Sequence, residues 1–319
     1  MDRIFLLYRI AFMVKGLPYI FNLLKEVCYN VSVKAKHLLV IDGLDDLLTL
    51  QLMQHNIITS LIAVADRINM QFLDSSVNAK IILLCRTDLF EILPGSNLNK
   101  IKHDSAIILN WYEEGVPLSS SNLVKLINLR AKVSLGYDAD VFEDLLPHSI
   151  LQGSSTMKTL LDNTRYRPRD FIQLFNYIQN STKGYKPTIP EVWSGIKRYS
   201  VNYLLDEIKN DLNGFLRDDE REKAIKILAL MNKSSFNLQE LETRKNLDPR
   251  FKSLDLVRIL QALFDCGAIS NYRKDENGRD INTTKYRSPT AYFDPNEGIK
   301  IHWGLWKAFN IADQYHEDM

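Results

Sequence analysis

Residues 37–48 read HLLVIDGLDDLL, and this stretch decides how the rest of the chain is interpreted. Four apolar residues run into Asp42, a glycine and the acidic pair Asp45 and Asp46. A short apolar run that ends at a turn signal is typical of a strand buried on both faces of a parallel α/β sheet. Open α/β sheets bind ligands at the carboxyl ends of their strands, so Asp42 is a candidate metal ligand. The alternative is an ordinary buried strand that ends in an acidic turn.

The composition is that of an ordinary globular protein. The chain has 319 residues, of which 45% are hydrophobic and 25% charged, which is long for one domain and comfortable for two. A formal net charge of +1 gives no global electrostatic case for nucleic acid. Three widely spaced cysteines and no Cys/His cluster of zinc spacing predict a reducing, cytoplasmic setting without disulfides or a zinc site.

Within the first 28 residues, the segment 4–24 is strongly apolar. Arg9, Lys15 and Pro18 interrupt it, and no signal-peptide cleavage site is present. A bilayer span needs roughly 20 residues with few or no charges. We therefore expect buried helices with a break at 16–18; a membrane or interfacial role is the alternative.

The pattern of apolar residues in the segment 31–109 predicts a βαβ unit with a right-handed crossover. Apolar runs predict three strands, and helical spacing of apolar residues predicts a long helix between the first two. These elements are a strand at 31–41, a helix at 47–72, a strand at 81–85 and a short strand at 106–109.

From residue 119 onward the predicted elements are mainly helical. A first group of helices covers 122–133, 139–146, 156–162, 169–179 and 191–210, with Pro168 at a helix start. A second group covers 220–231, 238–245 and 254–266, and two short strands at 268–272 and 284–286 follow around an Asn277-Gly278 turn. Three helices and a hairpin are the pattern of a winged helix. The tail 299–311 is expected to pack back as a short strand or helix.

The D-G-hydrophobic-D-D sequence after the first strand resembles the Walker B motif of STAND-class P-loop NTPases, which include NACHT-type ATPases. The resemblance implies that Asp42 holds Mg²⁺ against ATP, and that Asp45 and Asp46 orient or activate the attacking water. Arg86, at the tip of the second strand, resembles the sensor 1 arginine beside the γ-phosphate. Alternatively, Asp45 and Asp46 cap the next helix, and Arg86 is a surface arginine paired with Asp88.

A second resemblance lies in the segment TRYRPRD, residues 164–170. R-P-R-D at the start of a lid helix is similar to a motif of bacterial STAND-type ATPases, some of them encoded near phage-defence genes. The resemblance implies that Arg167 and Arg169 reach the phosphates and couple nucleotide state to domain position. The alternative is a helix-capping and salt-bridge cluster around Asp170.

The Walker A motif G-x-x-x-x-G-K-[ST] is missing, because none of the thirteen glycines is followed by lysine. We therefore expect weak nucleotide binding or none. Two explanations stay open: an N-terminally truncated product of a longer ATPase, or a degenerate paralogue kept for assembly or regulation.

The sequence thus predicts an α/β fold, a partial parallel-sheet P-loop NTPase core, followed by an α-helical lid and a winged helix. The expected domains are 1–117, 118–212 and 213–319. The predicted function is a nucleotide-dependent switch of the STAND ATPase type, in a soluble protein with a homo-oligomeric or protein partner. The alternative is a non-catalytic winged-helix protein that binds DNA or has a regulatory role. Its candidate nucleic-acid contacts are Arg273, Lys274, Arg279, Lys285 and Arg287.

Overall fold

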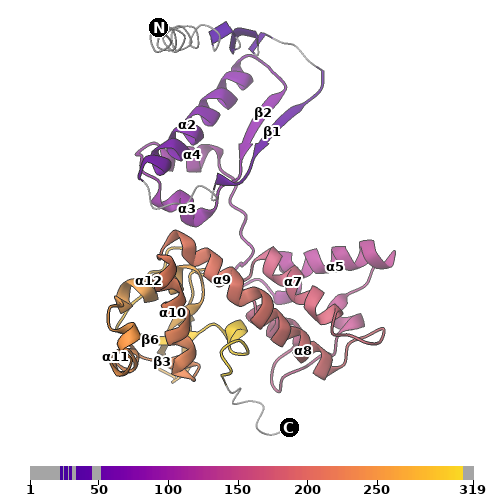
Figure 1. Cartoon of the computed structure of the whole chain (residues 1–319). Coiled ribbons are helices and arrows are strands. Elements are labelled where there is room, and N and C mark those ends of the chain that lie inside the picture. Colours follow the sequence, from indigo (N-terminus) through magenta and orange to yellow (C-terminus); the bar gives the residue numbers. More distant parts are fainter. Residues whose placement is uncertain (1–21, 24, 28, 31–33, 45–51, 312–319) are drawn as a thin grey trace, which may run out of the picture. The chain divides into compact units, whose positions relative to one another are not determined.

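The computed structural model describes residues 22–23, 25–27, 29–30, 34–44 and 52–311. The chain forms two compact units, residues 1–108 and 109–319 (Figure 1). Helices are combined with a parallel two-stranded sheet in the first unit and with an antiparallel sheet in the second, so the fold is mixed α/β. Over the described ranges, no helix has the length and apolar character needed to cross a membrane. The three-domain division stays a prediction.

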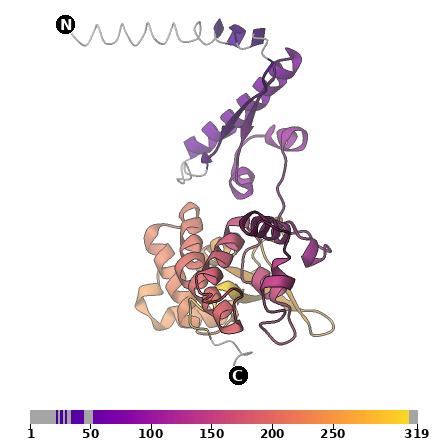
Figure 2. The ribbon, with the colours of Figure 1, turned by 90° about the vertical axis from the view of Figure 1, so that its right-hand side faces the viewer.

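The first unit contains the predicted βαβ arrangement. Strands β1 (His37–Ile41) and β2 (Ala79–Leu83) are parallel, and α2 (Leu52–Asp74) connects them. Helices α3 (Thr87–Ile92) and α4 (Leu98–Ser105) follow. In the views of Figures 1 and 2, α2 runs beside the two strands. The small core of this unit consists of Leu44, Ile58, Ile62, Leu89, Leu93 and Leu98.

The expectation that β1 is buried on both faces is wrong. Leu38, Leu39 and Val40 are 60%, 56% and 48% exposed. Successive side chains of a strand point to opposite faces, so β1 shows apolar side chains on both. The physical reason is the width of the sheet, which has only two strands among the described residues.

The predicted third strand at 106–109 is also wrong. Residues 106–110 have no regular secondary structure, and Ile107 and Leu109 are 88% and 72% exposed. The outer edge of β2 is bonded elsewhere at Ile81, whose N–H donates to Oδ1 of Asn69 at 2.7 Å. The Asn69 amide in turn donates to the Ile81 carbonyl at 2.8 Å. A side chain of α2 thus stands where a neighbouring strand would bond.

The second unit begins with the predicted helical block. Ser121 caps α5 (Asn122–Leu135), since its hydroxyl accepts a hydrogen bond from the Val124 N–H. The helix expected at 139–146 is only a short π-helical turn, Val141–Leu145, capped by Asp140. The block continues with α6 (Thr156–Asp162), α7 (Pro168–Gln179) and α8 (Ile189–Tyr199). A π-helical turn, Ser200–Leu204, separates α8 from α9 (Leu205–Asp211), so the helix expected at 191–210 is interrupted.

The rest of this unit has the order helix, strand, two helices and three strands. The helices are α10 (Asp218–Met231), α11 (Leu238–Leu247) and α12 (Leu256–Asp265). The antiparallel sheet has the order β3-β6-β4-β5, formed by β3 (Ser235–Phe236), β4 (Ile269–Lys274), β5 (Asp280–Thr283) and β6 (Gly298–Ile301). The strand expected at 284–286 is wrong because the hairpin resumes pairing directly after its turn, with Asp280 opposite Lys274. The winged-helix assignment stays a prediction.

One hydrophobic core runs through the second unit, from Leu123 in α5 to Ile311 near the end of the described chain. Helices α7 and α8 approach closely at Gly195, where an added Cβ would lie 2.6 Å from the Cα of Ile178. Ile178 is itself buried. The absence of a side chain at Gly195 therefore sets the spacing of these two helices.

Candidate functional site

The carboxyl edge of the β1–β2 sheet brings together two of the predicted site residues. Ile41 lies opposite Leu83 in the register, and the Leu84 N–H donates to the Ile41 carbonyl at 2.9 Å. Asp42 follows β1 directly, and Arg86 lies three residues after β2. Both residues therefore lie at the edge where parallel sheets bind ligands.

The surroundings of Asp42 and Arg86 differ. Asp42 is exposed, and its Oδ1 accepts a 2.7 Å hydrogen bond from the N–H of Gly43, whose φ is 78°. This bond leaves the carboxylate facing solvent with acceptor capacity to spare. Arg86 is half-buried and takes the N-cap position of α3, in an extended conformation. Asp45, Asp46 and the Asp88 side chain lie outside what the structure describes.

A single carboxylate suits a magnesium–nucleotide complex better than a free metal ion. Among the described residues, no group of three or more His, Cys, Asp or Glu side chains is placed to hold a metal. Mg²⁺ usually keeps several waters and binds through one or two carboxylates plus substrate phosphates. Asp42 therefore fits the metal only when phosphates complete its coordination, and Arg86 fits as a donor to such phosphates.

The TRYRPRD segment is held in a buried ionic network of the second unit. Arg165 is almost fully buried, and its Nε donates to Asp170 at 2.9 Å. Its Nη1 donates to Asp211 at 2.6 Å and to the Cys266 carbonyl at 3.2 Å. Burial alone would lower the pKa of Arg165, but the carboxylates of Asp170 and Asp211 raise it above its usual value. Arg165 is thus a charged structural bridge between the two halves of the unit.

The two arginines predicted to reach phosphates have different positions. Arg167 is half-buried, and its Nη1 donates to Asp211 at 2.6 Å, so it shares this carboxylate with Arg165. Arg169 is exposed and makes no hydrogen bond or ion pair with the described part of the chain. Arg165 and Arg167 are therefore both ion-paired to Asp211, and the contact of Arg167 and Arg169 with phosphates stays a prediction.

Aromatic and imidazole groups surround the same network. The Oη of Tyr203 donates to Asp170 at 3.3 Å, whereas the buried Oη of Tyr199 has no hydrogen-bond partner among the described residues. Nδ1 of His302 accepts from the Gly304 N–H at 3.1 Å, and Nε2 lies 3.2 Å from the Thr164 carbonyl. Burial, and after it the charge of Arg165, lowers the pKa of His302 to about 4. A neutral imidazole with its proton on Nε2 satisfies both contacts.

The five predicted nucleic-acid contacts divide into an outer and an inner group. Arg273, Lys274 and Arg279 are exposed on the β4–β5 hairpin, where Lys274 pairs with Asp280 at 2.9 Å and Arg273 lies 4.0 Å from Glu297. The hairpin also carries the acidic residues 275, 276 and 280, which offset this charge.

The inner group contacts the protein itself. Lys285 lies 4.0 Å from Asp265. Arg287 donates to Asp162 at 2.7 Å and lies over the rings of Tyr112, Tyr166 and Tyr286, at 5.2, 5.0 and 5.9 Å from their centroids. Arg287 thus lies in an aromatic cage within the second unit.

Sequence reasoning missed the partners that complete this network, chiefly Asp211, His302 and the tyrosine cage. Asp211 is 46 residues from Arg165, and no motif links the two. Only the density of arginines at 165–169 indicated that several acceptors had to lie nearby.

Comparisons with known proteins concern the helical block. No curated protein and no solved structure matches the chain. Residues 121–207, which begin just before α5 and end within α9, match the family described as the FunZ-associated C-terminal helical domain.

Proposed function

We propose that this chain is a regulatory component of a STAND-like nucleotide switch, with weak nucleotide affinity of its own. The observation that carries the proposal is the register of β1 and β2, since it brings Asp42 and Arg86 to one edge of a parallel sheet. A carboxylate for Mg²⁺ and a guanidinium for phosphate are the groups that a Walker B strand and a sensor strand contribute.

Weak affinity follows from what accompanies these two residues. Backbone N–H groups and the lysine of a P-loop make most of the contacts that bind a triphosphate, and the sequence has no such motif. The exposed apolar side chains of β1 also indicate a sheet that other strands would complete. We propose that such strands, from a longer form of the chain or from a partner, carry the phosphate-binding loop.

The second unit would act as the responsive part of the switch. Arg165 joins the helical block to the Cys266 carbonyl at the end of α12, and Arg167 shares Asp211 with it. Competition between a bound anion and Asp211 for Arg167 would loosen one of these ionic bonds. We also propose a setting in phage defence, which the resemblance of the TRYRPRD segment implies; this segment lies within residues 121–207, which match the FunZ-associated domain.

Nucleotide titration tests the proposal. A fluorescent ATP analogue should bind the wild-type chain in the presence of Mg²⁺ with a Kd of about 1 mM, which corresponds to only about 4 kcal/mol. Asp42→Asn and Arg86→Ala should abolish the signal. Two variants on α2 serve as matched controls and should leave it unchanged: Asp74→Asn, which is at the opposite end of the sheet, and Arg67→Ala, which is exposed. Equal binding by all five proteins would refute the assignment of this edge.

A second candidate function is DNA binding by residues 218–301. The order of helices α10, α11 and α12 before the β4–β5 hairpin favours it, as do the exposed Arg273, Lys274 and Arg279. Salt-dependent affinity for a DNA duplex that falls when these three residues are changed to glutamine would support it. Affinity that is unchanged in the triple variant would remove its basis.

A further inference from the structure

Helix α5 carries an apolar ridge on its outer side. Its inner side packs into the core through buried Leu123, Val124 and Ile127. On the outer side, Leu129 is 58% exposed and Val133 is 79% exposed. Residues four apart lie on one face of a helix, so these two side chains form a continuous stripe.

Two tyrosines extend this stripe beyond the end of α5. Tyr137 is 50% exposed and Tyr185 is 71% exposed, and their hydroxyl oxygens lie 2.7 Å apart. The contact ties the loop after α7 to the end of α5. We define the α5 ridge as Leu129, Val133, Tyr137 and Tyr185. Aliphatic and tyrosine side chains together on a surface are typical of protein interfaces.

The charged side chains on α5 itself all have one sign. Residues 119–137 contain no Asp or Glu, and their basic residues are Lys125, Arg130 and Lys132. Lys132 pairs with Asp138 at 2.8 Å. Lys125 and Arg130 are exposed and form no ion pair within the described ranges, and the same holds for Lys186 beside Tyr185. A ligand that lies along α5 therefore meets the uncompensated charges of Lys125 and Arg130, whereas the carboxylates of Asp138 and Asp140 lie beyond the end of the helix.

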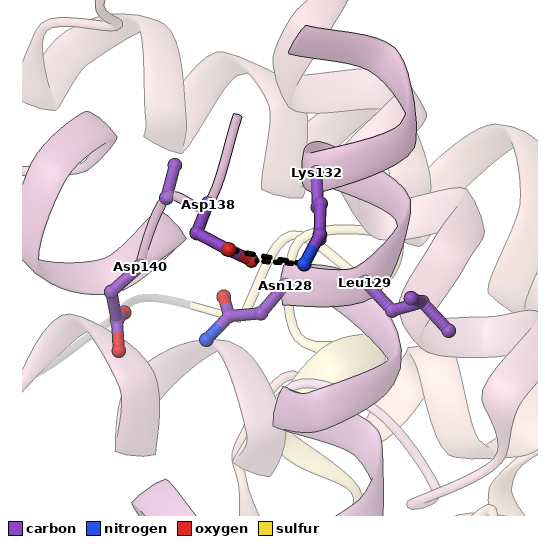
Figure 3. A pocket seen from close by; sticks show the side chains of 6 residues that line it. Asn128, Leu129, Lys132, Asp138 and Asp140 are labelled. Carbon is purple, nitrogen blue, oxygen red and sulfur yellow. Dashed lines mark hydrogen bonds and ion pairs between the residues drawn. The ribbon is translucent and has the colours of Figure 1, made fainter. Parts of the chain in front are cut away.

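A hollow of about 470 Å³ borders the α5 ridge. It is lined by residues 128, 129, 132 and 138–140. Figure 3 shows Lys132 and Asp138 meeting across it, while Leu129 points away from them. The exposed apolar stripe and a polar hollow thus lie side by side, and the hollow has room for a side chain of a partner helix.

We propose that the α5 ridge docks an acidic amphipathic helix of a partner protein. The apolar face of that helix would cover Leu129 and Val133, and its carboxylates would pair with Lys125 and Arg130. Charge complementarity selects this occupant, because the ridge supplies apolar contact and positive charge but no negative charge on α5. The proposal lies within the matched domain and does not depend on nucleotide binding.

Fluorescence anisotropy with a defined probe tests this docking. The probe is a fluorescein-labelled peptide of leucine and glutamate, about 15 residues long and patterned as an amphipathic helix, enough to lie along α5. A scrambled peptide of the same composition keeps the charge and loses the apolar face. The wild-type chain should bind the patterned peptide at least about tenfold more tightly than the scrambled one, a difference of about 1.4 kcal/mol.

Variants locate the binding. Val133→Asp, Leu129→Ser and the pair Lys125→Gln/Arg130→Gln should each weaken binding of the patterned peptide about tenfold or more. Leu247→Asp is the matched control, because Leu247 is 72% exposed on α11 of the same unit, and it should bind like wild type. A circular-dichroism melt of each variant checks that the fold is intact. Equal affinity for both peptides, or wild-type affinity of Val133→Asp and Leu129→Ser, would overturn the proposal. So would tighter binding to a DNA duplex or to phosphatidylserine vesicles than to the patterned peptide.

Discussion

The side-chain amide of Asn69 bonds both backbone polar groups of Ile81, accepting from its N–H at 2.7 Å and donating to its carbonyl at 2.8 Å. These are the two bonds that a neighbouring strand would make to β2 at Ile81. A residue of α2 thereby satisfies one position of a sheet edge that would otherwise be open to pairing with other chains. At Ile81 the backbone polar groups of β2 are therefore satisfied without a third strand.

Replacing Asn69 by leucine should expose this edge. We expect loss of about 1–3 kcal/mol from the first unit, because both backbone groups of Ile81 lose their partner. Hydrogen exchange at the Ile81 amide should become faster. All four tryptophans are at 111, 193, 303 and 306, so the tryptophan-detected unfolding of the second unit should not change. Asn56→Leu, an exposed position on the same helix, is the control. Unchanged exchange at Ile81 would contradict the assigned role of Asn69.

The buried pair Arg165 and Asp170 should be costly to break from one side. Asp170→Ala leaves the guanidinium of Arg165 with fewer acceptors in the core, and we expect a loss of about 3–5 kcal/mol. Urea unfolding followed by tryptophan fluorescence measures it. The double variant Arg165→Met/Asp170→Leu removes both charges and should lose less than Asp170→Ala alone. A larger loss in the double variant would mean that packing, not unpaired charge, dominates.

Local patterns predicted most helices of the second unit and the parallel pairing of β1 with β2. Periodicity, a serine cap and Pro168 determine such elements within a few residues of sequence. The segment 106–110 does not follow this rule, because its apolar run is exposed and Asn69 already bonds the outer edge of β2 at Ile81. The buried network could not be predicted from local patterns, because Arg165 bonds Asp211 and the Cys266 carbonyl, which are distant in sequence.

Gly195 offers a steric test of the contact between α7 and α8. Gly195→Ala should destabilise the second unit by about 1–3 kcal/mol, since the new methyl group would meet the backbone of Ile178. Gly184→Ala is the matched control: its Cβ would lie 3.8 Å from the nearest atom, and it should be nearly neutral. Thermal unfolding followed by tryptophan fluorescence compares the two. Equal melting temperatures would show that the helices can separate at no cost.

Arg287 and Arg279 should respond differently to the same change, although both are basic residues of the predicted wing. Arg287→Gln should lower the stability of the second unit by about 1–3 kcal/mol, because three aromatic rings lose their cation and the Asp162 carboxylate keeps only Lys158 as a cationic partner. Arg279→Gln, on the exposed hairpin, should change stability by less than about 0.5 kcal/mol. Chemical unfolding followed by tryptophan fluorescence measures the loss of stability in each variant. Similar small effects for both would place Arg287 outside any structural role.

His302 should make the second unit less stable as the pH falls. In the unfolded chain a histidine takes up a proton below its ordinary pKa of 6.5, whereas in the folded protein the pKa of His302 is lowered to about 4. The unfolded state therefore binds more protons between these two values, and the free energy of unfolding decreases as the pH drops through this window, by up to about 3 kcal/mol. The geometry agrees, because protonation of Nδ1 would set an N–H against the N–H of Gly304.

Comparison with a variant separates the contribution of His302 to the pH dependence of stability from the contributions of other groups. Urea unfolding between pH 7 and pH 4 should show a steep loss of stability in the wild-type chain and a shallower one in His302→Gln, which cannot titrate. His148→Gln is the control for the loss of an imidazole, because the His148 side chain is 77% exposed. An NMR titration of the His302 ring gives the pKa directly. A value near 6.5 would show that the imidazole is not held neutral by burial beside Arg165.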